Sequence, residues 1–445
     1  MEVSPKEYYA HLYPYDKLVH LLTHNGDDLA SIEFAIEGLS PQGDKFYRRY
    51  VSVKSAKELK AEVANFPYVK AFHFGAVYTG KPSNSARVSL PVRRVLSFDI
   101  DLTDKDWIPL KEKGGDVSLP LCDRAWPVCA ASVDLLKRIL KLAFGYTQVL
   151  VVYSGRRGAH VHVFDEGAMS LGNEGRAAII GYVNGTTGTD KLRSTSGVHL
   201  VMKMHNLRKH VYRLFELWFV GHMGILDSLD NRNTFLNRLD LYKYDSLTDV
   251  MDMLVGDVMD KDTAIDAWRC IVQKLEGVRE RVPWALDRLD CAVLFYVWPV
   301  LDTNVTRDTA HLTKVPFACH AKTGRVACAV NVDTPWNFIP SLEAPTLVEW
   351  NQENMDVALS HFHNIGVSDH VAEERHRALQ ESGTVPSTHA ITDQVMRDLE
   401  RKAEEALCDV EDLVEAPPPP PPPPKATIPR KMTFKRKKSP LVPEE

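Results

Sequence analysis

The stretch Leu96–Asp101, with the sequence LSFDID, constrains the fold of this chain most, because it places two carboxylates at the end of an apolar run. Side chains alternate between the two faces of a β-strand, so Asp99 and Asp101 point to one side while Phe98 and Ile100 point into a core. Two ionised acids on one face repel each other, and a divalent cation between them relieves that cost. Most D-x-D pairs are solvated strand ends, so the rest of the chain has to decide between the two interpretations.

Apolar periodicity predicts strands on both sides of this stretch, with helices between them. Strands are expected at 33–36, 46–53, 71–78 and 149–153, with further β character around 302 and 326–332, and helices at 4–23, 56–65 and 347–362. From 172 to about 288 the helical period dominates. The pattern predicts an α+β fold in which a strand-rich core carries an inserted α-helical subdomain.

The same pattern predicts where the parts of the chain begin and end. We expect a core made of residues 1–171 and 291–389, a helical subdomain at 172–290, a C-terminal helix at 390–416 and a disordered tail at 417–445. Residues 417–424 are all proline and predict an extended spacer, or alternatively an SH3-type ligand. The basic run 435–438 fits a nuclear localisation signal, and the same charges also suit weak phosphate contacts or a plain solvated end.

Composition narrows the function classes. The net charge of −5 over 445 residues excludes bulk attraction to nucleic acid, so any contact with a polyanion needs a local basic cleft. Seven scattered cysteines predict reduced thiols in an intracellular protein. No apolar run approaches the ~20 residues needed to cross a bilayer, so no membrane association is expected.

A second motif, SGRRGAH at 154–160, has the composition of a polyphosphate clamp. Its glycines let the backbone approach a ligand, the forks of Arg156 and Arg157 match phosphate oxygens, and Ser154 offers a hydroxyl. An isolated R-R-G is more often an exposed basic turn. We interpret His160 as a hydrogen-bond donor to phosphate and His162 as packing, although two histidines on one strand face also suit a metal.

A third motif, LDTNV at 301–305, precedes a run of cations that includes Lys314 and His320. If Asp302 joins Asp99 and Asp101, three carboxylates suffice to hold two hard divalent ions about 4 Å apart. The arginines, His160, Lys314 and His320 would then neutralise a triphosphate. Acids for metals and bases for phosphates are the arrangement that phosphoryl transfer requires.

Taken in order, FDIDLTD, VYSGRRGAH and LDTNV followed by HLTKVPFACHAKTGR closely resemble the small catalytic subunit of the eukaryotic-type DNA primase, a member of the archaeo-eukaryotic primase superfamily. The likeness is collinear from Tyr8-Tyr9, through the sequence FGAVY at 74–78, to about Arg325. It is sparse in the helical middle and absent from the proline-rich tail.

The resemblance implies a mixed β-sheet catalytic core and a DNA-directed RNA polymerase, a nucleotidyltransferase that makes short RNA primers on single-stranded DNA from ribonucleoside triphosphates in DNA replication. It implies two Mg²⁺ or Mn²⁺ ions as cofactors. As partners it implies a large iron-sulfur primase subunit and the DNA polymerase alpha complex in a nuclear primosome. Carried onto this chain, the metal ligands are Asp99, Asp101 and Asp302, and the triphosphate is held by Ser154, Arg156, Arg157, His160, Lys314 and His320.

One departure concerns zinc. The family usually has a four-cysteine zinc site between the first two motifs, whereas this chain keeps only Cys122 and Cys129 there, with Trp126 where a C-P-x-C would begin. Two thiolates do not complete a tetrahedral site. We therefore predict that structural zinc is lost, or rebuilt with other ligands.

Two other functions remain open at the level of sequence. One is a related primase-polymerase that extends primers with deoxynucleotides in damage tolerance or end joining. The other is a non-catalytic nucleic-acid-binding or assembly subunit. The presence of all three acids and every clamp residue favours catalysis.

Overall fold

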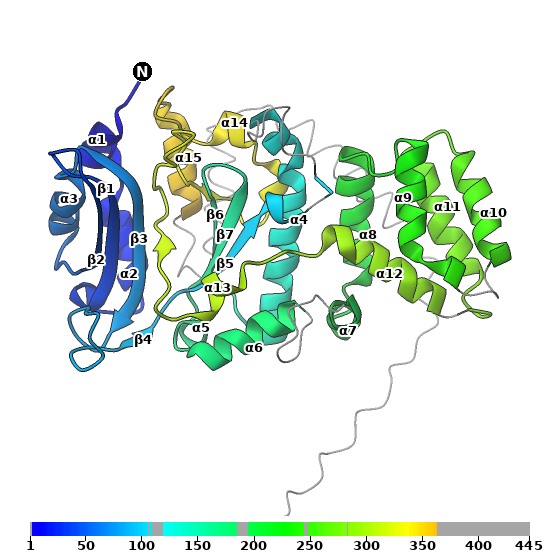
Figure 1. Ribbon diagram of the computed structural model, residues 1–445, viewed down its shortest axis with the longest axis horizontal. Helices are drawn as coiled ribbons and strands as arrows, with labels where there is room; N and C mark the ends of the chain where they lie inside the picture. The colour runs from blue at the N-terminus through cyan, green and yellow to red at the C-terminus, as the bar shows by residue number, and fades with distance from the viewer. Residues whose placement is uncertain are drawn as a thin grey trace, which may run out of the picture. The chain divides into compact units, whose positions relative to one another are not determined.

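The computed structural model describes residues 2–105, 107–108, 119–184, 195–243, 248–282 and 284–362 (Figure 1). All of them belong to one compact unit, residues 1–378. The C-terminal helix predicted at 390–416, the polyproline run at 417–424 and the basic cluster at 435–438 lie outside the described residues.

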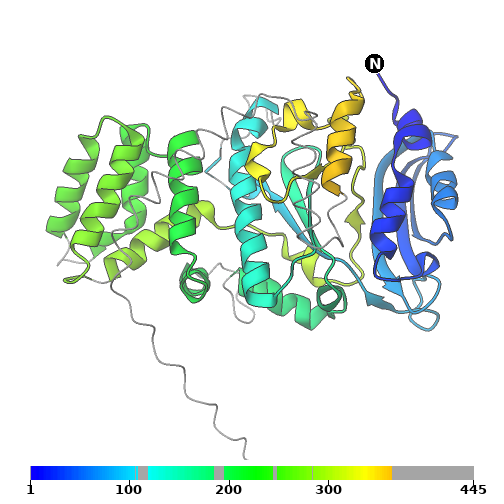
Figure 2. The same ribbon diagram turned by 180° about the vertical axis from the view of Figure 1, so that it is seen from behind.

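The first of two antiparallel sheets is built from the N-terminal part of the chain, in the order β2-β1-β3-β4, and β8 pairs with β3 from far along the sequence. The strands predicted at 33–36 and 46–53 pair as an antiparallel hairpin, β1 with β2, with a bulge between Phe34 and Ile36. Tyr9 and Tyr13 from the N-terminal helices pack against Phe72 of the central strand, so these helices cover one face, seen from behind in Figure 2. The elements are α1 (Pro5–Glu7), η1 (Tyr8–Leu12), α2 (Tyr15–Thr23), η2 (Leu29–Ser31), β1 (Ile32–Leu39), β2 (Lys45–Val51), α3 (Ala56–Ala64), β3 (Tyr68–Tyr78), β4 (Pro91–Arg93) and β8 (Thr313–Lys314).

The second sheet has the order β5-β7-β6-β9, and its pairs are also antiparallel. The long helix α4 packs against β5 and β7, with the side chains of Cys129, Val133 and Leu136 fully buried. Two sheets with helices on their faces confirm the α+β class. The elements here are β5 (Leu96–Asp101), η3 (Leu102–Asp104), α4 (Leu119–Phe144), β6 (Val149–Tyr153), β7 (Gly158–Val163), α5 (Glu166–Met169) and β9 (Ala329–Val330).

Helices without strands occupy the described residues from 173 to 297, drawn in green in Figure 1. Aromatic rings hold them together: Phe215 lies 4.7 Å from Trp268 and 5.8 Å from Tyr296 between ring centroids. The elements are α6 (Asn173–Val183), α7 (Thr195–Met204), α8 (Arg208–Leu214), η4 (Phe215–His222), α9 (Leu229–Leu239), η5 (Leu241–Lys243), α10 (Thr248–Met259), α11 (Ala264–Gly277) and α12 (Trp284–Val297).

The chain then returns to the second sheet through α13 (Thr303–Arg307). The expected β character around Asp302 is wrong, because the Asp302 carboxylate accepts the backbone N–H of Asn304 at 2.9 Å and thereby caps α13. The strand expected at 326–332 shortens to β9. The remaining elements are η7 (Pro335–Asn337), α14 (Pro340–Glu343) and α15 (Gln352–Phe362).

Composition predicted that the chain has no membrane-spanning segment and that its cysteines are reduced thiols. In the described parts of the chain, no helix has both the length and the apolar character that crossing a membrane requires. The six cysteines among the described residues are free thiols.

Candidate functional site

Three aspartates meet at one end of the second sheet. Asp99 and Asp101 alternate with buried residues on β5, and in the pairing with β7 they lie opposite His160 and Gly158. The backbone N–H of Asp302 donates to the carbonyl oxygen of Asp99 at 3.3 Å. The structure therefore brings the third acid to the strand that carries the other two.

The pKa of Asp99 reflects the closeness of the three acids. Burial, followed by the neighbouring charges of Asp101 and Asp302, raises the pKa of Asp99 to about 6. Lys314 and His311 act in the opposite direction but do not compensate. The three carboxylates therefore form a site that is short of positive charge.

This shift predicts how stability depends on pH when divalent ions are removed with a chelator. The folded chain keeps the Asp99 proton up to about pH 6, whereas the unfolded chain releases it near its ordinary value of about 4, so this group lowers stability as the pH rises through that window. We expect Asp99→Asn to unfold at a higher temperature than the wild type at about pH 7.5, and the difference to vanish towards about pH 4. Parallel curves of unfolding temperature against pH would contradict the shift.

The predicted clamp is the turn between β6 and β7. Gly155 has φ +88°, and a Cβ there would lie 2.8 Å from the Cβ of His320. A Cβ on Gly158 would lie 2.2 Å from the carbonyl oxygen of Ile100. Both glycines are thus required by close backbone approach, one against the His320 loop and the other against the acidic strand.

Arg157 and Ser154 are both engaged within this turn. The Nε of Arg157 donates to both carboxylate oxygens of Asp101, at 3.0 and 2.9 Å, and its carbonyl accepts the N–H of Leu102. The hydroxyl of Ser154 accepts the N–H of Gly158 at 3.2 Å. The clamp and the acidic pair are therefore in direct contact.

Lys314 contacts the clamp, and His160 lies beside the acids. The Nζ of Lys314 donates to the carbonyl of Ser154 at 3.2 Å, and burial lowers its pKa to about 8. Burial, followed by the charge of Lys314, lowers the pKa of His160 to about 3, so its ring is neutral at physiological pH. Its Nε2 lies 3.7 Å from Oδ1 of Asp99. A neutral imidazole here has one N–H to donate.

His320 and Arg156 are the last two of the predicted triphosphate residues. Thr323 of the same loop donates its hydroxyl to the carbonyl of Gly155 at 2.7 Å, which fixes the loop against the clamp. Burial first, then Lys314 and Arg156, lowers the pKa of His320 to about 4. Every predicted triphosphate residue therefore lies on the β6–β7 turn, on β7 itself, or on segments in contact with that turn.

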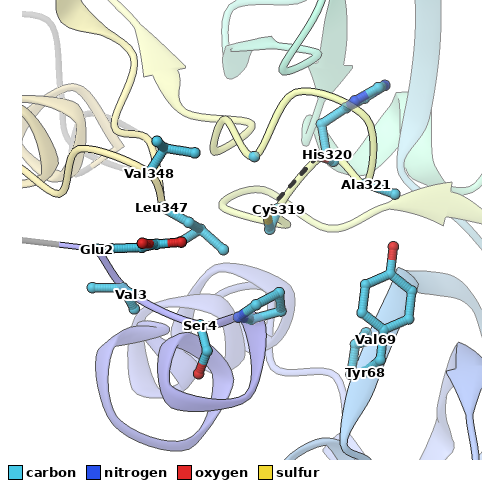
Figure 3. A pocket seen from close by; sticks show the side chains of 12 residues that line it. Glu2, Val3, Ser4, Tyr68, Val69, Cys319, His320, Ala321, Leu347 and Val348 are labelled. Atoms are coloured by element: carbon cyan, nitrogen blue, oxygen red, sulfur yellow. Dashed lines mark hydrogen bonds between the residues drawn. The ribbon is translucent and has the colours of Figure 1, made fainter.

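A pocket of about 270 Å³ lies behind the His320 loop, lined by the N-terminal residues 2–5, the start of β3 and Val348 among others (Figure 3). The ring of His320 points away from Glu2 and Ser4. The ring is thus directed to the side of the loop opposite the pocket.

Sequence reasoning missed His73. It lies on β3 opposite Lys314, it is largely buried, and its Nδ1 has no hydrogen-bond partner among the residues that the structure describes. Burial, followed by Lys314, lowers its pKa to about 4. No local signal identified it, because the pairing of β3 with β8 joins residues that are distant in the chain.

Two adjacent arginines of β2 have different partners. Arg48 pairs with Glu62 of α3 at 2.6 Å. Arg49 pairs at 2.9 Å with Glu33, whose side chain is fully buried, and also donates to the carbonyl of Ala310. Arg49 thus links the first sheet to the segment that leads to β8.

The other residues considered as metal ligands, His162, Cys122 and Cys129, are buried in the core. The Nδ1 of His162 lies 3.0 Å from the hydroxyl of Ser97 in the core. Cys122 and Cys129 are buried on α4, and burial raises the pKa of both thiols, that of Cys122 to about 11. Across the described residues, no three His, Cys, Asp or Glu side chains are already arranged to hold a metal ion. Loss of the cysteine zinc site stays a prediction.

Comparison with known proteins assigns this sequence to a family. Residues 98–332, which include all three motifs, match the family model described as DNA primase small subunit. The chain is 28% identical over 366 residues to the DNA primase small subunit of Schizosaccharomyces pombe, covering 78% of this chain and 76% of that protein. The counterparts from Drosophila melanogaster (26% identity, 77% and 79% covered) and Saccharomyces cerevisiae (28% identity, 79% and 86% covered) are similar over comparable lengths. The chain belongs to the DNA primase small subunit family.

Proposed function

We propose that this chain is the catalytic subunit of a DNA primase, a DNA-directed RNA polymerase that makes short RNA primers on single-stranded DNA for replication. The observation that carries the proposal is the hydrogen bond from the backbone N–H of Asp302 to the carbonyl oxygen of Asp99. It brings the third acid to the strand of the acidic pair. The hydrogen bonds from Arg157 to Asp101 then join this acidic group, suited to metal ions, to the cationic group suited to a triphosphate. Membership of the DNA primase small subunit family supports this proposal.

The acidic group suits two Mg²⁺ or Mn²⁺ ions by its donor chemistry. Carboxylate oxygens are the ligands that these hard cations prefer, and the raised pKa of Asp99 marks a site where positive charge is lacking. Asp99, Asp101 and Asp302 would hold the ions. When bound, they lower the pKa of the attacking 3′-hydroxyl and stabilise the charge that develops on the leaving pyrophosphate.

The cationic group binds and orients the nucleotide. Arg156 and Arg157 offer forked donors to phosphate oxygens, Lys314 offers a point charge, and the neutral rings of His160 and His320 donate single hydrogen bonds. The low pKa of the two imidazoles means that they bind phosphate without adding charge. Arg157 also holds Asp101, so nucleotide binding and the geometry of the acids are coupled.

Partners and compartment follow from the same assignment. Small primase subunits are expected to act with a large iron-sulfur subunit and the DNA polymerase alpha complex in the nucleus. The basic run at 435–438 supports nuclear localisation. These assignments rest on the resemblance and the sequence.

Primer synthesis on single-stranded DNA, with the large subunit present and absent, tests the proposal. We expect ribonucleotide products that require Mg²⁺ or Mn²⁺ and disappear with a chelator. Efficient extension of existing primers by deoxynucleotides, with poor initiation from ribonucleotides, would favour the primase-polymerase alternative. Template binding without nucleotide incorporation under any condition would favour a non-catalytic subunit.

A further inference from the structure

Asp302 reaches the other two acids only after the chain has passed through the whole helical region. The segment that carries Asp302 is therefore distant in sequence from β5, the strand that carries the other two acids. Something must hold this segment against β5. Two buried cations, one on each side of β5 in the sequence, make the contacts that do so.

The first cation is Lys105, which follows Asp101 and η3. Its side chain is buried, and Nζ donates to the carbonyl oxygens of Tyr296 at 2.7 Å and Trp298 at 2.9 Å. These carbonyls lie at the C-terminal end of α12, where helix carbonyls lack intrahelical partners and the helix dipole favours a cation. Lys105 therefore fixes the chain just before it reaches Asp302.

The second cation is Arg94, which precedes β5 and is 1% exposed. Its guanidinium donates to the carbonyls of Val305 at 2.9 Å and Asp308 at 3.1 Å, and to the hydroxyl of Thr313 at 2.7 Å. These groups lie in and after α13, the helix that Asp302 caps. Arg94 therefore fixes the chain just after Asp302.

Two further hydrogen bonds join the same segment to backbone carbonyls of β5. The N–H of Asp302 donates to Asp99, and the hydroxyl of Thr306 donates to the carbonyl of Ser97 at 2.9 Å. The segment 296–313 is thus joined to the acidic strand and its flanks along its length. Because burying a cation is costly, two such cations that contact the same segment indicate a requirement for fixed geometry there.

We propose that Lys105 and Arg94 are positioning residues that hold the segment carrying Asp302 against the strand carrying Asp99 and Asp101. Neither residue belongs to the predicted metal ligands or to the predicted triphosphate-binding residues. Their effect on catalysis rests on the proposed primase function, whereas their effect on the segment does not.

The positioning role is tested directly by hydrogen exchange, measured by mass spectrometry on the full chain bound to the large subunit. Each anchor contributes hydrogen bonds from a charged donor, so we expect amides in 299–308 to exchange about tenfold faster in Lys105→Met and Arg94→Met. Lys105→Arg, which keeps a cation at the end of α12, should restore protection. In primer synthesis, Lys105→Met should lower kcat about tenfold while the nucleotide KM changes less than about twofold, because the triphosphate residues are untouched.

Matched controls separate positioning from general stability. Arg232 is equally buried and donates to the carbonyls of Leu226, Val258 and Lys261 within the helical region. Lys137 donates to the carbonyl of Val332 and to Asp333. We expect Arg232→Met and Lys137→Met to leave exchange in 299–308 unchanged, even where they lower the unfolding temperature.

The outcomes divide clearly. Two results would overturn the proposed positioning role: unchanged protection of 299–308 in Lys105→Met, or faster exchange that is equal throughout both sheets. If Lys105→Met does not fold, hydrogen exchange in 299–308 is measured instead on Lys105→Gln, which retains a hydrogen-bond donor. A wild-type complex that makes no primers would defeat the proposed function, and the exchange pattern would still decide the positioning role.

Discussion

Replacing Asp302 by Asn should reduce primer synthesis by about a thousandfold or more, which corresponds to about 4 kcal/mol of transition-state stabilisation. Asn keeps the size of the side chain and still accepts the N–H of Asn304, so the cap of α13 is preserved. What is lost is one negative charge facing Asp99. The measurement is the rate of primer synthesis at saturating nucleotide, together with the unfolding temperature, which should change little.

Asp28→Asn is the matched control for this variant. Asp28 also caps a helical turn, because its carboxylate accepts the N–H of Ala30 at 3.0 Å, but it lies outside the acidic group. We expect it to retain wild-type activity. A second readout is internal: since Asp302 helps to raise the pKa of Asp99, the pKa of Asp99 should fall in Asp302→Asn. Near wild-type primer synthesis by Asp302→Asn would remove Asp302 from the proposed metal site.

Replacing Gly158 by Ala should lower both stability and activity sharply. The new Cβ would lie 2.2 Å from the carbonyl oxygen of Ile100, and the contact is with backbone that has no rotamer to change. The strands must separate where Asp101 pairs with Gly158, at a cost of about 3 kcal/mol, near the upper end for overpacking. Thermal unfolding and primer synthesis, measured on the same preparation, give the two effects.

Gly256→Ala provides the contrast. Gly256 lies inside α10, and a Cβ there meets no atom within 4 Å. Alanine should therefore stabilise the helix by about 0.5–1 kcal/mol and leave activity unchanged. If both glycine variants behaved alike, close approach at Gly158 would not be the reason for its glycine.

Much of the local structure could be predicted because it depends on neighbouring residues. Alternation of apolar and polar residues marks β5, the bounding glycines mark the β6–β7 turn, and aromatic residues at helical spacing mark the N-terminal helices. The start of α13 was misjudged because a short helix of five residues has no periodicity to detect. Only the capping contact from Asp302 reveals it.

The contacts that join distant segments could not be predicted in the same way. In the sequence, Lys105 and Arg94 are charged residues near the ends of β5, and such residues are usually solvated. Their burial depends on the return of the chain after α12, which no local pattern specifies. The same holds for His73, whose neighbour Lys314 lies on a strand far along the sequence.

The sequence alone determined the chemical groups of this protein: the acidic pair on one strand face, the glycine-bounded arginines, and the cations after Asp302, because each depends on spacing within a few residues. The tertiary structure decided that these groups share one place, that Arg157 holds Asp101, and that buried cations secure the third acid. The physical reason is that side-chain alternation and turn chemistry are local. The position of Asp302 depends instead on packing and buried hydrogen bonds between segments brought together only by the complete fold.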